Sequence, residues 1–530
     1  MAAATGGRPG GAPRPRLGLR LRRGLWLTGP IALFTLLRIP SFLEPHWYTD
    51  EAGYVTTARS LLQGRVLYAQ VWNNKPPIHL WTVAVVIQLF GTSEAALHTI
   101  TFVTGVLTLL AVAYLGSHLL SRRRTLVALL VVAVLLGSPL FDAELLVPES
   151  LLIAPITWAG AIVLTRAGIL DPRRWPLWPA AVGVLAGIAV GYQQTALAET
   201  CAFGLILALV GRSSWRRVVL YVTPVLAVTA AWLIPAVVTA GAGKVAYALV
   251  GYWIPFTQYR YSGGGAGHAL LHLALPVGVL ALLVAGAWLC RRDREPRWGL
   301  WVWAGAALMV PAVARQPWAH YLIPSLVPTV LACSSLPLRS PVGAPLVRRL
   351  AGGALVVGTL LAAAGASSAG MDWVDIIDGN PHNVLVYYAG AASVLTRGQS
   401  LEAYQDQFDY RVPEDSAVSA WMSAHGLDGS SAVVWSADAW LYDDNQLQLI
   451  LPTPPIYNDE ALLGNHGPVA RRVAELDPEV VVTEGASRRS YPEINAVLTS
   501  GYQEVDQSGT EIVWVRDSMG AAVIASPAAG

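Results

Sequence analysis

The chain has 530 residues, of which 54% are hydrophobic and 13% are charged, and its formal net charge is +2. So little charge excludes an ordinary soluble protein, and a net charge near zero gives no indication of nucleic-acid binding. Long apolar runs recur from Leu25 to about Ala364, which predicts an integral membrane protein. The three cysteines, Cys201, Cys290 and Cys333, lie in or beside these runs and form neither a disulfide framework nor a metal-ligand pattern.

Residues 1–24 are predicted to form a basic cytoplasmic tail, followed by a transmembrane domain over residues 25–368. About eleven spans are expected, at 25–43, 95–119, 125–141, 149–165, 175–191, 195–210, 218–240, 269–290, 299–314, 318–336 and 350–364. Arginine-rich connections alternate with connections rich in acidic, amide, histidine and aromatic residues, and the arginine-rich set is predicted to face the cytoplasm. An odd number of spans then places the chain after Ser367 on the extracytoplasmic side of the plasma membrane.

The first extracytoplasmic connection, residues 44–78, carries the adjacent carboxylates Asp50 and Glu51 directly after the first apolar run. An acidic pair beside the bilayer is costly, which points to a function. Residues 53–63 and 78–91 are each too short to span and are predicted to be helices at the membrane surface. Between them, the segment 73–77 contains Lys75 and two prolines, and a turn that joins the two helices is the structural alternative to a functional role.

The composition changes at about Asp372, and residues 369–517 are predicted to form an extracytoplasmic α/β domain, with a disordered tail at 518–530. Residues 431–435 and 480–483 have the pattern of buried strands, 467–475 that of a helix, and 501–515 that of a hairpin turning at Ser508-Gly509. The acidic stretch 438–444 lacks the periodicity of a calcium loop and is interpreted as a solvated loop.

Several short motifs follow one another in a characteristic order: Asp50-Glu51-Ala52-Gly53-Tyr54, residues 58–64, Lys75-Pro76-Pro77, residues 89–91, Ser93-Glu94, and His320-Tyr321-Leu322 before Pro324. Residues 433–435, 477–482 and Gly501-Tyr502 continue the series. In their order and spacing they resemble the bacterial dolichyl-phosphate-mannose protein mannosyltransferase-like family, the relatives of the aminoarabinose transferase of lipid A. The resemblance covers nearly the whole chain. His79 and Tyr192-Gln193-Gln194 depart from the family pattern, which leaves the substrate preference open.

The resemblance implies a mainly α-helical polytopic membrane protein with the GT-C fold. It also implies inverting transfer of a sugar from a polyprenyl-phosphate donor to an extracytoplasmic acceptor. Because the donor phosphate is already a good leaving group, the reaction chiefly needs one base for the acceptor hydroxyl and cations for the phosphate. Asp50 is the predicted base, and Glu51 is expected to orient it or to bind sugar hydroxyls. An acidic pair stabilised by a helix dipole is a compatible structural role.

Three cationic residues are candidates for binding the donor phosphate. Lys75 is one of only two lysines in the chain and is placed near the membrane surface. Arg59 is expected to pair with a phosphate or an acidic loop residue, and an arginine extended along an interfacial helix is the alternative. Arg315 is the second predicted phosphate ligand.

The remaining candidates for substrate binding lie in later extracytoplasmic connections. Glu149 is expected to bind acceptor, sugar or metal, and the alternative is a charge in the first turn of a helix. Gln193 and Gln194 either bind sugar hydroxyls or satisfy backbone groups of their turn. His320 and Tyr321 flank the tenth span, and His320 equally fits an interfacial histidine.

Tyr259 belongs to an aromatic segment, residues 252–268, that is either a lid over the donor or an interfacial aromatic belt. Metal dependence is open, because Asp50, Glu149 and His320 could meet around a divalent cation or act without one. The alternatives to an enzyme are a membrane transporter and a catalytically inactive glycan-binding scaffold. The gathering of ionisable residues at one membrane face, without internal repeats, favours the enzyme. The sequence specifies neither the donor sugar nor the acceptor, which could be a cell-envelope polysaccharide, a lipid or a protein.

Overall fold

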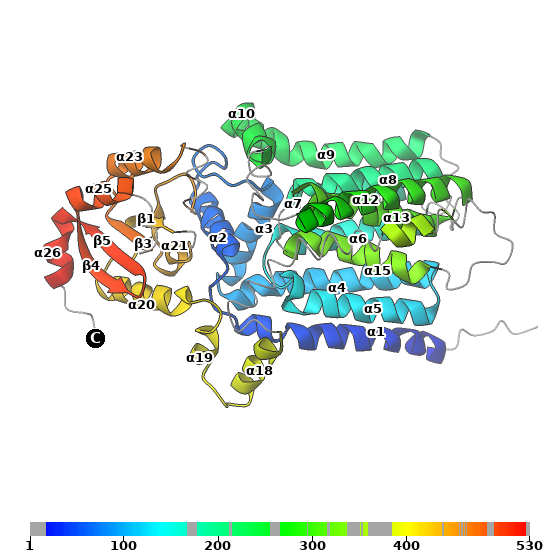
Figure 1. Ribbon diagram of the computed structural model, residues 1–530, viewed down its shortest axis with the longest axis horizontal. Helices are drawn as coiled ribbons and strands as arrows, with labels where there is room; N and C mark the ends of the chain where they lie inside the picture. Colours follow the sequence, from blue (N-terminus) through cyan, green and yellow to red (C-terminus); the bar gives the residue numbers. More distant parts are fainter. Residues whose placement is uncertain are drawn as a thin grey trace, which may run out of the picture.

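The computed structural model describes residues 17–166, 177–210, 215–254, 266–293, 295–314, 319–336, 350, 353–358, 384–436, 439–454, 456, 459, 462, 464–484 and 492–525. A bundle of helices that run side by side forms one half of the molecule, and a sheet with its covering helices forms the other (Figure 1). Two short helices, α2 (Thr49–Leu62) and α3 (Pro77–Phe90), lie between the halves. The candidate site is built on this middle layer.

The main helices of the bundle are α1 (Leu17–Arg38), α4 (Glu94–Leu119), α5 (Arg122–Gly137), α6 (Pro148–Arg166), α7 (Trp178–Tyr192), α8 (Leu197–Val210), α9 (Trp215–Ala240), α12 (Ala266–Asp293), α13 (Gly299–Ala307) and α15 (Ile323–Ser335). Shorter segments connect them: η1 (Pro40–Leu43), η2 (Pro139–Phe141), η4 (Gln194–Ala196), α10 (Ala242–Ala246), η5 (Tyr247–Gly251), η6 (Pro296–Trp298), α14 (Met309–Ala314) and η7 (Ala319–Leu322). In the described part of the chain, 5 stretches are long and apolar enough to cross a membrane, namely Trp26–Leu43, Glu94–Leu119, Pro148–Thr165, Trp215–Ala240 and Ala274–Asp293. The number of eleven spans stays a prediction.

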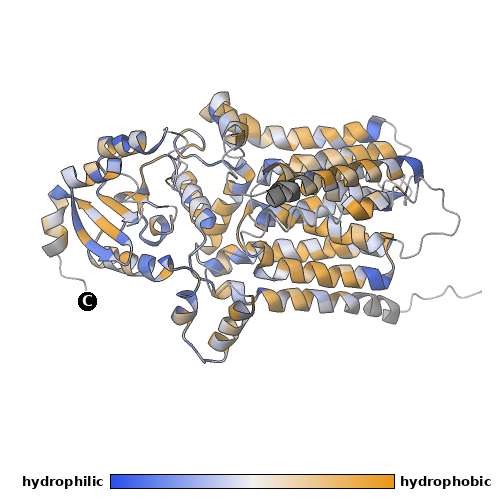
Figure 2. Ribbon diagram, viewed as in Figure 1, coloured by the Kyte–Doolittle hydropathy of each residue, from blue (hydrophilic) through white to orange (hydrophobic). Residues whose placement is uncertain are grey.

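The outer surface of the bundle is apolar. On α9, Leu226, Ile234 and Val238 are exposed, and hydrophobic residues follow most of the bundle helices in Figure 2. A water-soluble protein does not expose so much contiguous apolar surface, whereas lipid tails are a suitable solvent for it. The chain is therefore a multi-pass membrane protein.

Small residues bring bundle helices together where lipid provides no hydrophobic force between them. A side chain at Gly183 of α7 would overlap the carbonyl oxygen of Tyr221 in α9. At the edge of the bundle, α3 begins with Pro77 and ends before Gly91, whose φ of 81° favours glycine. The two predicted surface helices are confirmed as elements, but α2 begins earlier than expected, at Thr49. Asp50 and Glu51 therefore lie inside its first turn.

The other half of the molecule holds a five-stranded sheet in the order β2-β1-β3-β5-β4. Its strands are β1 (Ser431–Trp435), β2 (Gln448–Leu449), β3 (Val480–Glu484), β4 (Tyr502–Ser508) and β5 (Glu511–Arg516). β1 pairs in parallel with β2 and β3, and β5 is antiparallel to β3 and β4. The covering helices are α20 (Arg411–Ala424), α21 (Leu441–Asp444), α23 (His466–Leu476), α25 (Pro492–Gly501) and α26 (Asp517–Ala525). The predicted strands, helix and hairpin coincide with β1, β3, α23 and β4–β5.

Two expectations for this half are wrong. The tail expected to be disordered begins inside α26, which packs on β4 and buries the side chain of Val523. The acidic stretch 438–444 is not a solvated loop, because Asp443 is only 3% exposed and forms an ion pair with Arg59. Before the sheet, α18 (Val384–Leu395) packs on η1, and α19 (Leu401–Gln405) follows it.

A single hydrophobic core joins α2 and α3 to the sheet half. It includes Ala52 and Val55 of α2 and Leu80 of α3, together with Trp440 and Val482 from the sheet half. Apolar burial of this kind is the main source of stability in a folded chain. The helix with the acidic pair is thus held between two parts of the protein.

Candidate functional site

The first turn of α2 presents Asp50 at the boundary between the two halves. Asp50 is half-buried, and the hydroxyl of Tyr54, one helical turn later, donates a hydrogen bond to its Oδ2 over 3.4 Å. Because Asp50 is partly exposed, a bound molecule can reach its side chain.

Carboxylates from three elements surround Tyr48, which precedes α2. Burial raises the pKa of the Tyr48 hydroxyl well above its usual range, and the charges of Asp50, Asp142, Glu51 and Glu149 raise it further. Tyr48 therefore stays a neutral hydroxyl that can donate a hydrogen bond beside several anions. These carboxylates come from α2, from the end of η2 and from the start of α6, so three distant segments converge here.

His320 of η7 joins the same cluster. Its Nδ1 lies 3.5 Å from Asp142 Oδ2 and 3.4 Å from the Tyr48 hydroxyl. Asp142 adopts a left-handed backbone conformation, with φ of 55°, which is uncommon outside glycine and often marks a functional position. The predicted candidate His320 is thus placed beside Asp50, and Asp142 and Tyr48 are site residues that sequence reasoning missed.

Glu149 and Gln193 form a buried pair at the membrane side of the cluster. The Gln193 amide donates to Glu149 Oε1 over 3.0 Å, while Glu149 Oε2 has no hydrogen bond in the described structure. Gln194 instead donates to the carbonyl of Leu249 over 3.3 Å. This backbone group belongs to η5 and not to the turn of Gln194 itself, so neither of the two predicted roles of Gln194 is tested by this contact.

Lys75 lies near the ring of Tyr54, the residue whose hydroxyl contacts Asp50. Its ammonium Nζ is 5.9 Å from the ring centroid of Tyr54 and 5.3 Å from that of Trp253, and the residue is 5% exposed. Among the described residues no carboxylate forms an ion pair with it. Aromatic faces stabilise an ammonium without neutralising it, so the charge remains available to an anion.

Glu51 points away from Asp50 into the protein interior. It is fully buried, accepts a hydrogen bond from the backbone N–H of Leu146, and lies 3.4 Å from His98 Nε2. These contacts fit a group that fixes the position of α2, whereas binding of sugar hydroxyls by Glu51 stays a prediction.

Arg59, expected to bind phosphate or an acidic loop residue, is occupied by the sheet half of the molecule. Its guanidinium donates to Asp443 Oδ1 over 3.1 Å, to the carbonyl of Leu447 over 3.1 Å, and to the carbonyl of Tyr442. These contacts match the expected pairing with an acidic residue, whereas the phosphate role stays a prediction. Arg59 fastens α2 to α21 and the segment after it.

We expect Arg59→Ala to loosen this attachment, because it leaves the nearly buried carboxylate of Asp443 without its cation. The loss in free energy of unfolding should be about 2 kcal/mol. Hydrogen exchange measured by mass spectrometry should then quicken in α2 and in residues 441–449. Arg472→Ala is the matched control, since it breaks an exposed ion pair with Glu475 that contributes under about 1 kcal/mol. Unchanged exchange in α2 would contradict the assignment.

His46 forms a second attachment between the halves. Its ring stacks on Trp440 with centroids 3.9 Å apart, its Nδ1 lies 2.9 Å from Asp444 Oδ1, and its Nε2 lies 3.0 Å from the Thr92 carbonyl. Burial alone favours the neutral ring, but the hydrogen bond and charge of Asp444 outweigh it and raise the pKa of His46 above its usual value. With acceptors at both nitrogens, the imidazolium form is favoured.

This raised pKa predicts that the attachment weakens as the solution becomes alkaline. The unfolded chain has a histidine pKa of about 6.5, so the stabilisation is complete below that pH and is lost as pH rises through the higher folded value. The thermal midpoint of the wild type should fall between about pH 6 and pH 8 more than that of His46→Gln. His118→Gln, at an exposed histidine, should follow the wild type. Parallel curves for wild type and His46→Gln would refute the prediction.

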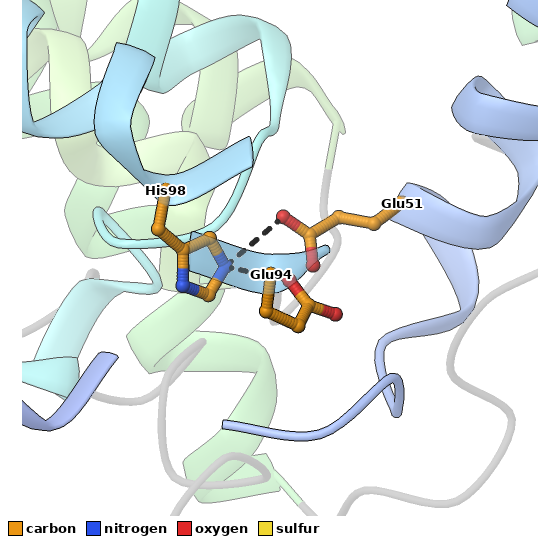
Figure 3. Close-up of side chains that lie close together, drawn as sticks. All are labelled: Glu51, Glu94 and His98. Carbon is orange, nitrogen blue, oxygen red and sulfur yellow. Dashed lines mark ion pairs between the residues drawn. The ribbon is translucent and has the colours of Figure 1, made fainter. Parts of the chain in front are cut away.

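The remaining candidate residues are Arg315, Tyr259, Tyr321 and the predicted metal ligands. Arg315 and Tyr259 lie outside the described residues. Tyr321 is buried, with its ring edge-on to His320. The described residues contain one group of three metal-ligating side chains, Glu51, Glu94 and His98 (Figure 3). It is not the predicted set of Asp50, Glu149 and His320.

Comparison with known proteins gives a family match for part of the chain and a fold match for nearly all of it. Residues 74–239 match the model of the family described as dolichyl-phosphate-mannose-protein mannosyltransferase. The structure is similar to that of ArnT from Cupriavidus metallidurans bound to undecaprenyl phosphate, with a TM-score of 0.58 and 15% identity over 94% of this chain and 98% of that chain. The apo state of ArnT gives a TM-score of 0.57 with the same identity and coverage.

The oligosaccharyltransferase AglB from Archaeoglobus fulgidus, in complex with an inhibitory peptide and dolichol-phosphate, has a TM-score of 0.45 and 13% identity over 94% of this chain and 74% of that chain. No curated protein sequence matches this chain. The chain is a polytopic membrane protein that shares the overall fold of ArnT. The family model over residues 74–239 supports, for that part of the chain, the resemblance to the mannosyltransferase-like family that the order of the motifs suggested.

Proposed function

We propose that this protein is an inverting membrane glycosyltransferase that transfers a monosaccharide from a polyprenyl-phosphate donor to an extracytoplasmic acceptor. The observation that carries the proposal is that Asp50 and Lys75 both lie against Tyr54, Asp50 at its hydroxyl and Lys75 near its ring. One is a partly exposed carboxylate and the other an ammonium held against aromatic faces. The family matched by residues 74–239 and the fold shared with ArnT support the same class of reaction.

In this mechanism the acceptor hydroxyl attacks the anomeric carbon from the face opposite the phosphate. Asp50 takes the hydroxyl proton while the bond between the anomeric carbon and the phosphate oxygen breaks. The electron pair of that bond leaves with the polyprenyl phosphate, and Lys75 stabilises the developing negative charge. A single displacement of this kind inverts the anomeric configuration.

The surrounding groups would orient the reactants. The neutral Tyr48 hydroxyl and His320 face the same cluster as Asp50, and the Glu149–Gln193 pair offers hydrogen bonds to sugar or acceptor hydroxyls. Glu51 acts as a positioning group for α2. Arg315 and Tyr259 keep their proposed roles as a phosphate ligand and as part of a lid.

The site would open to the extracytoplasmic face of the plasma membrane, with the sheet half on the same side. Acceptors at that face include envelope polysaccharides, lipids and proteins. The sheet half, which holds α2 through Arg59 and His46, would lie where an acceptor approaches.

The test is sugar transfer by the purified protein in native-like lipid. Polyprenyl phosphates that carry radiolabelled mannose, arabinose or another hexose or pentose are offered with a cell-envelope extract as acceptor. Transfer from one donor, with release of polyprenyl phosphate, supports the proposal and names the sugar. Movement of intact donor across a sealed vesicle membrane without transfer would favour the transporter. Glycan binding without either would favour the inactive scaffold.

A further inference from the structure

Three side chains with metal-binding atoms converge between α2 and α4, behind the first turn of α2 (Figure 3). His98 Nε2 lies 3.4 Å from Glu51 Oε1 and 3.2 Å from Glu94 Oε2. Glu94 and His98 are four residues apart in α4, so they share one face of that helix, and Glu51 reaches them from α2. All three residues are buried, with exposures of 0%, 4% and 0% for Glu51, Glu94 and His98.

Most of the polar atoms of this group lack hydrogen bonds, although Glu51 Oε1 accepts one from the backbone N–H of Leu146. Glu51 Oε2, both carboxylate oxygens of Glu94, and His98 Nε2 are buried without a hydrogen-bond partner in the described structure. A buried carboxylate left without a donor or a cation is strongly destabilising. The position of Glu94 in the first turn of α4 gives it support from the helix dipole, but no N–H donates to it.

The tautomer of His98 follows from its other nitrogen. Nδ1 lies 2.6 Å from the carbonyl oxygen of Ser41, and a carbonyl can only accept, so Nδ1 carries a proton. In the neutral ring, Nε2 then presents its lone pair to the two glutamates. A histidine bound to metal through one nitrogen commonly donates its other N–H to a backbone carbonyl in this way.

The nearby arginine is engaged elsewhere. Arg38 donates to Thr101 Oγ1 over 2.5 Å and to the Glu144 carbonyl over 3.3 Å, and its Nη1 lies 4.0 Å from Glu144 Oε2. Metal ligation requires ionised carboxylates and a neutral imidazole, and in that form the three side chains would carry a charge of about −2, which a divalent cation would neutralise.

We infer that Glu51, Glu94 and His98 bind a divalent cation of the Zn²⁺ class. Imidazole nitrogen together with carboxylate oxygen suits this class, whereas Mg²⁺ and Ca²⁺ prefer oxygen ligands alone. The cation would join α2 to α4 through Glu51. Since Asp50 is the adjacent residue, the metal would fix the position of the proposed base without touching the substrate. The site is separate from the cluster of Asp142, Glu149 and His320.

The experiment uses the full-length protein in detergent, treated with a chelator, then dialysed against Zn²⁺ and against buffer alone. Elemental analysis should find about one Zn²⁺ per chain in the wild type and far less in His98→Arg and Glu94→Gln. His118→Gln, which removes an exposed histidine at the other end of α4, should keep the full complement. Zinc-edge X-ray absorption should show one imidazole, oxygen ligands and no sulfur. Adding Zn²⁺ should raise the thermal midpoint of the wild type and leave that of His98→Arg unchanged.

His98→Arg also tests the rival structure, in which a protonated His98 simply pairs with the two glutamates. An arginine supplies a permanent cation but cannot bind Zn²⁺. If chelator-treated wild type takes up no stoichiometric Zn²⁺, the inference is overturned, whatever the stability of the variants. Equal amounts of bound Zn²⁺ in the wild type and His98→Arg would mean that the metal binds adventitiously elsewhere. Loss of Zn²⁺ from His118→Gln would mean the same, and either result would also overturn the inference. Because these measurements involve no donor sugar, their failure is distinct from failure of the proposed glycosyl transfer.

Discussion

Asp50→Asn should reduce the rate of sugar transfer by about 10²- to 10⁴-fold, the usual contribution of a general base. The amide has the shape of the carboxylate and can keep the hydrogen bond from Tyr54, but it cannot take a proton from the acceptor hydroxyl. Because Asp50 is not expected to hold the donor phosphate, the loss should lie in kcat rather than in donor affinity. Initial rates and donor binding, both measured on purified protein in lipid nanodiscs, separate the two.

Asp406→Asn is the matched control for this variant. Asp406 is an exposed aspartate after α19, so the same substitution there should leave the transfer rate near that of the wild type. Transfer by Asp50→Asn within about twofold of the wild-type rate would rule out Asp50 as the base, because loss of a general base reduces the rate far more than that. The cluster of Asp142 and His320 would then be the next place to search.

Lys75→Gln should weaken donor binding by about 10- to 100-fold, which corresponds to the loss of one charge-assisted hydrogen bond of about 1.5–3 kcal/mol. The effect should appear mainly in KM for the polyprenyl-phosphate sugar. It should extend to kcat, because the negative charge on the phosphate grows as the sugar leaves. Lys75→Arg should recover part of the affinity, since it restores the charge with a different shape.

The chain provides its own control, because Lys244 is the only other lysine. It lies exposed in α10, so Lys244→Gln removes the same charge without touching Tyr54 or Trp253. We expect wild-type KM for this variant. Equal changes in KM for the two variants would mean that Lys75 acts only through the overall charge of the surface. Unchanged KM in Lys75→Gln alone would remove Lys75 from the phosphate site.

The elements of the middle layer were predictable because local signals define them. Pro77 and Gly91 bracket α3, and α2 follows the first apolar run with acidic residues in its first turn. The motif resemblance indicated Asp50 and Lys75, and the structure places both beside Tyr54. Long buried strands such as β1 and β3 were similarly readable from their runs of valine.

Contacts between distant segments could not be read in the same way. Asp443, the partner of Arg59, is 384 residues away in the sequence. The sequence therefore could not specify which acidic residue pairs with Arg59, and a phosphate was an equally compatible partner. Asp142 could not be predicted as a site residue because its contact with His320 depends on the left-handed backbone conformation at Asp142. The spacing of Glu94 and His98 on one helix face was visible, but the third ligand, Glu51, comes from a separate helix.

The core shared by α2 and the sheet half has a consequence for the order of events during synthesis. The ribosome makes α2 among the first residues, whereas Trp440, Tyr442 and Leu447, which cover it, are made several hundred residues later. Domains assemble as their partners emerge, and distant contacts form last. The helix that carries Asp50 therefore waits, with part of its apolar face uncovered, until the C-terminal region has been translated and folded. A chain that stops before that point lacks the residues that pack on α2 and that accept the hydrogen bonds of Arg59.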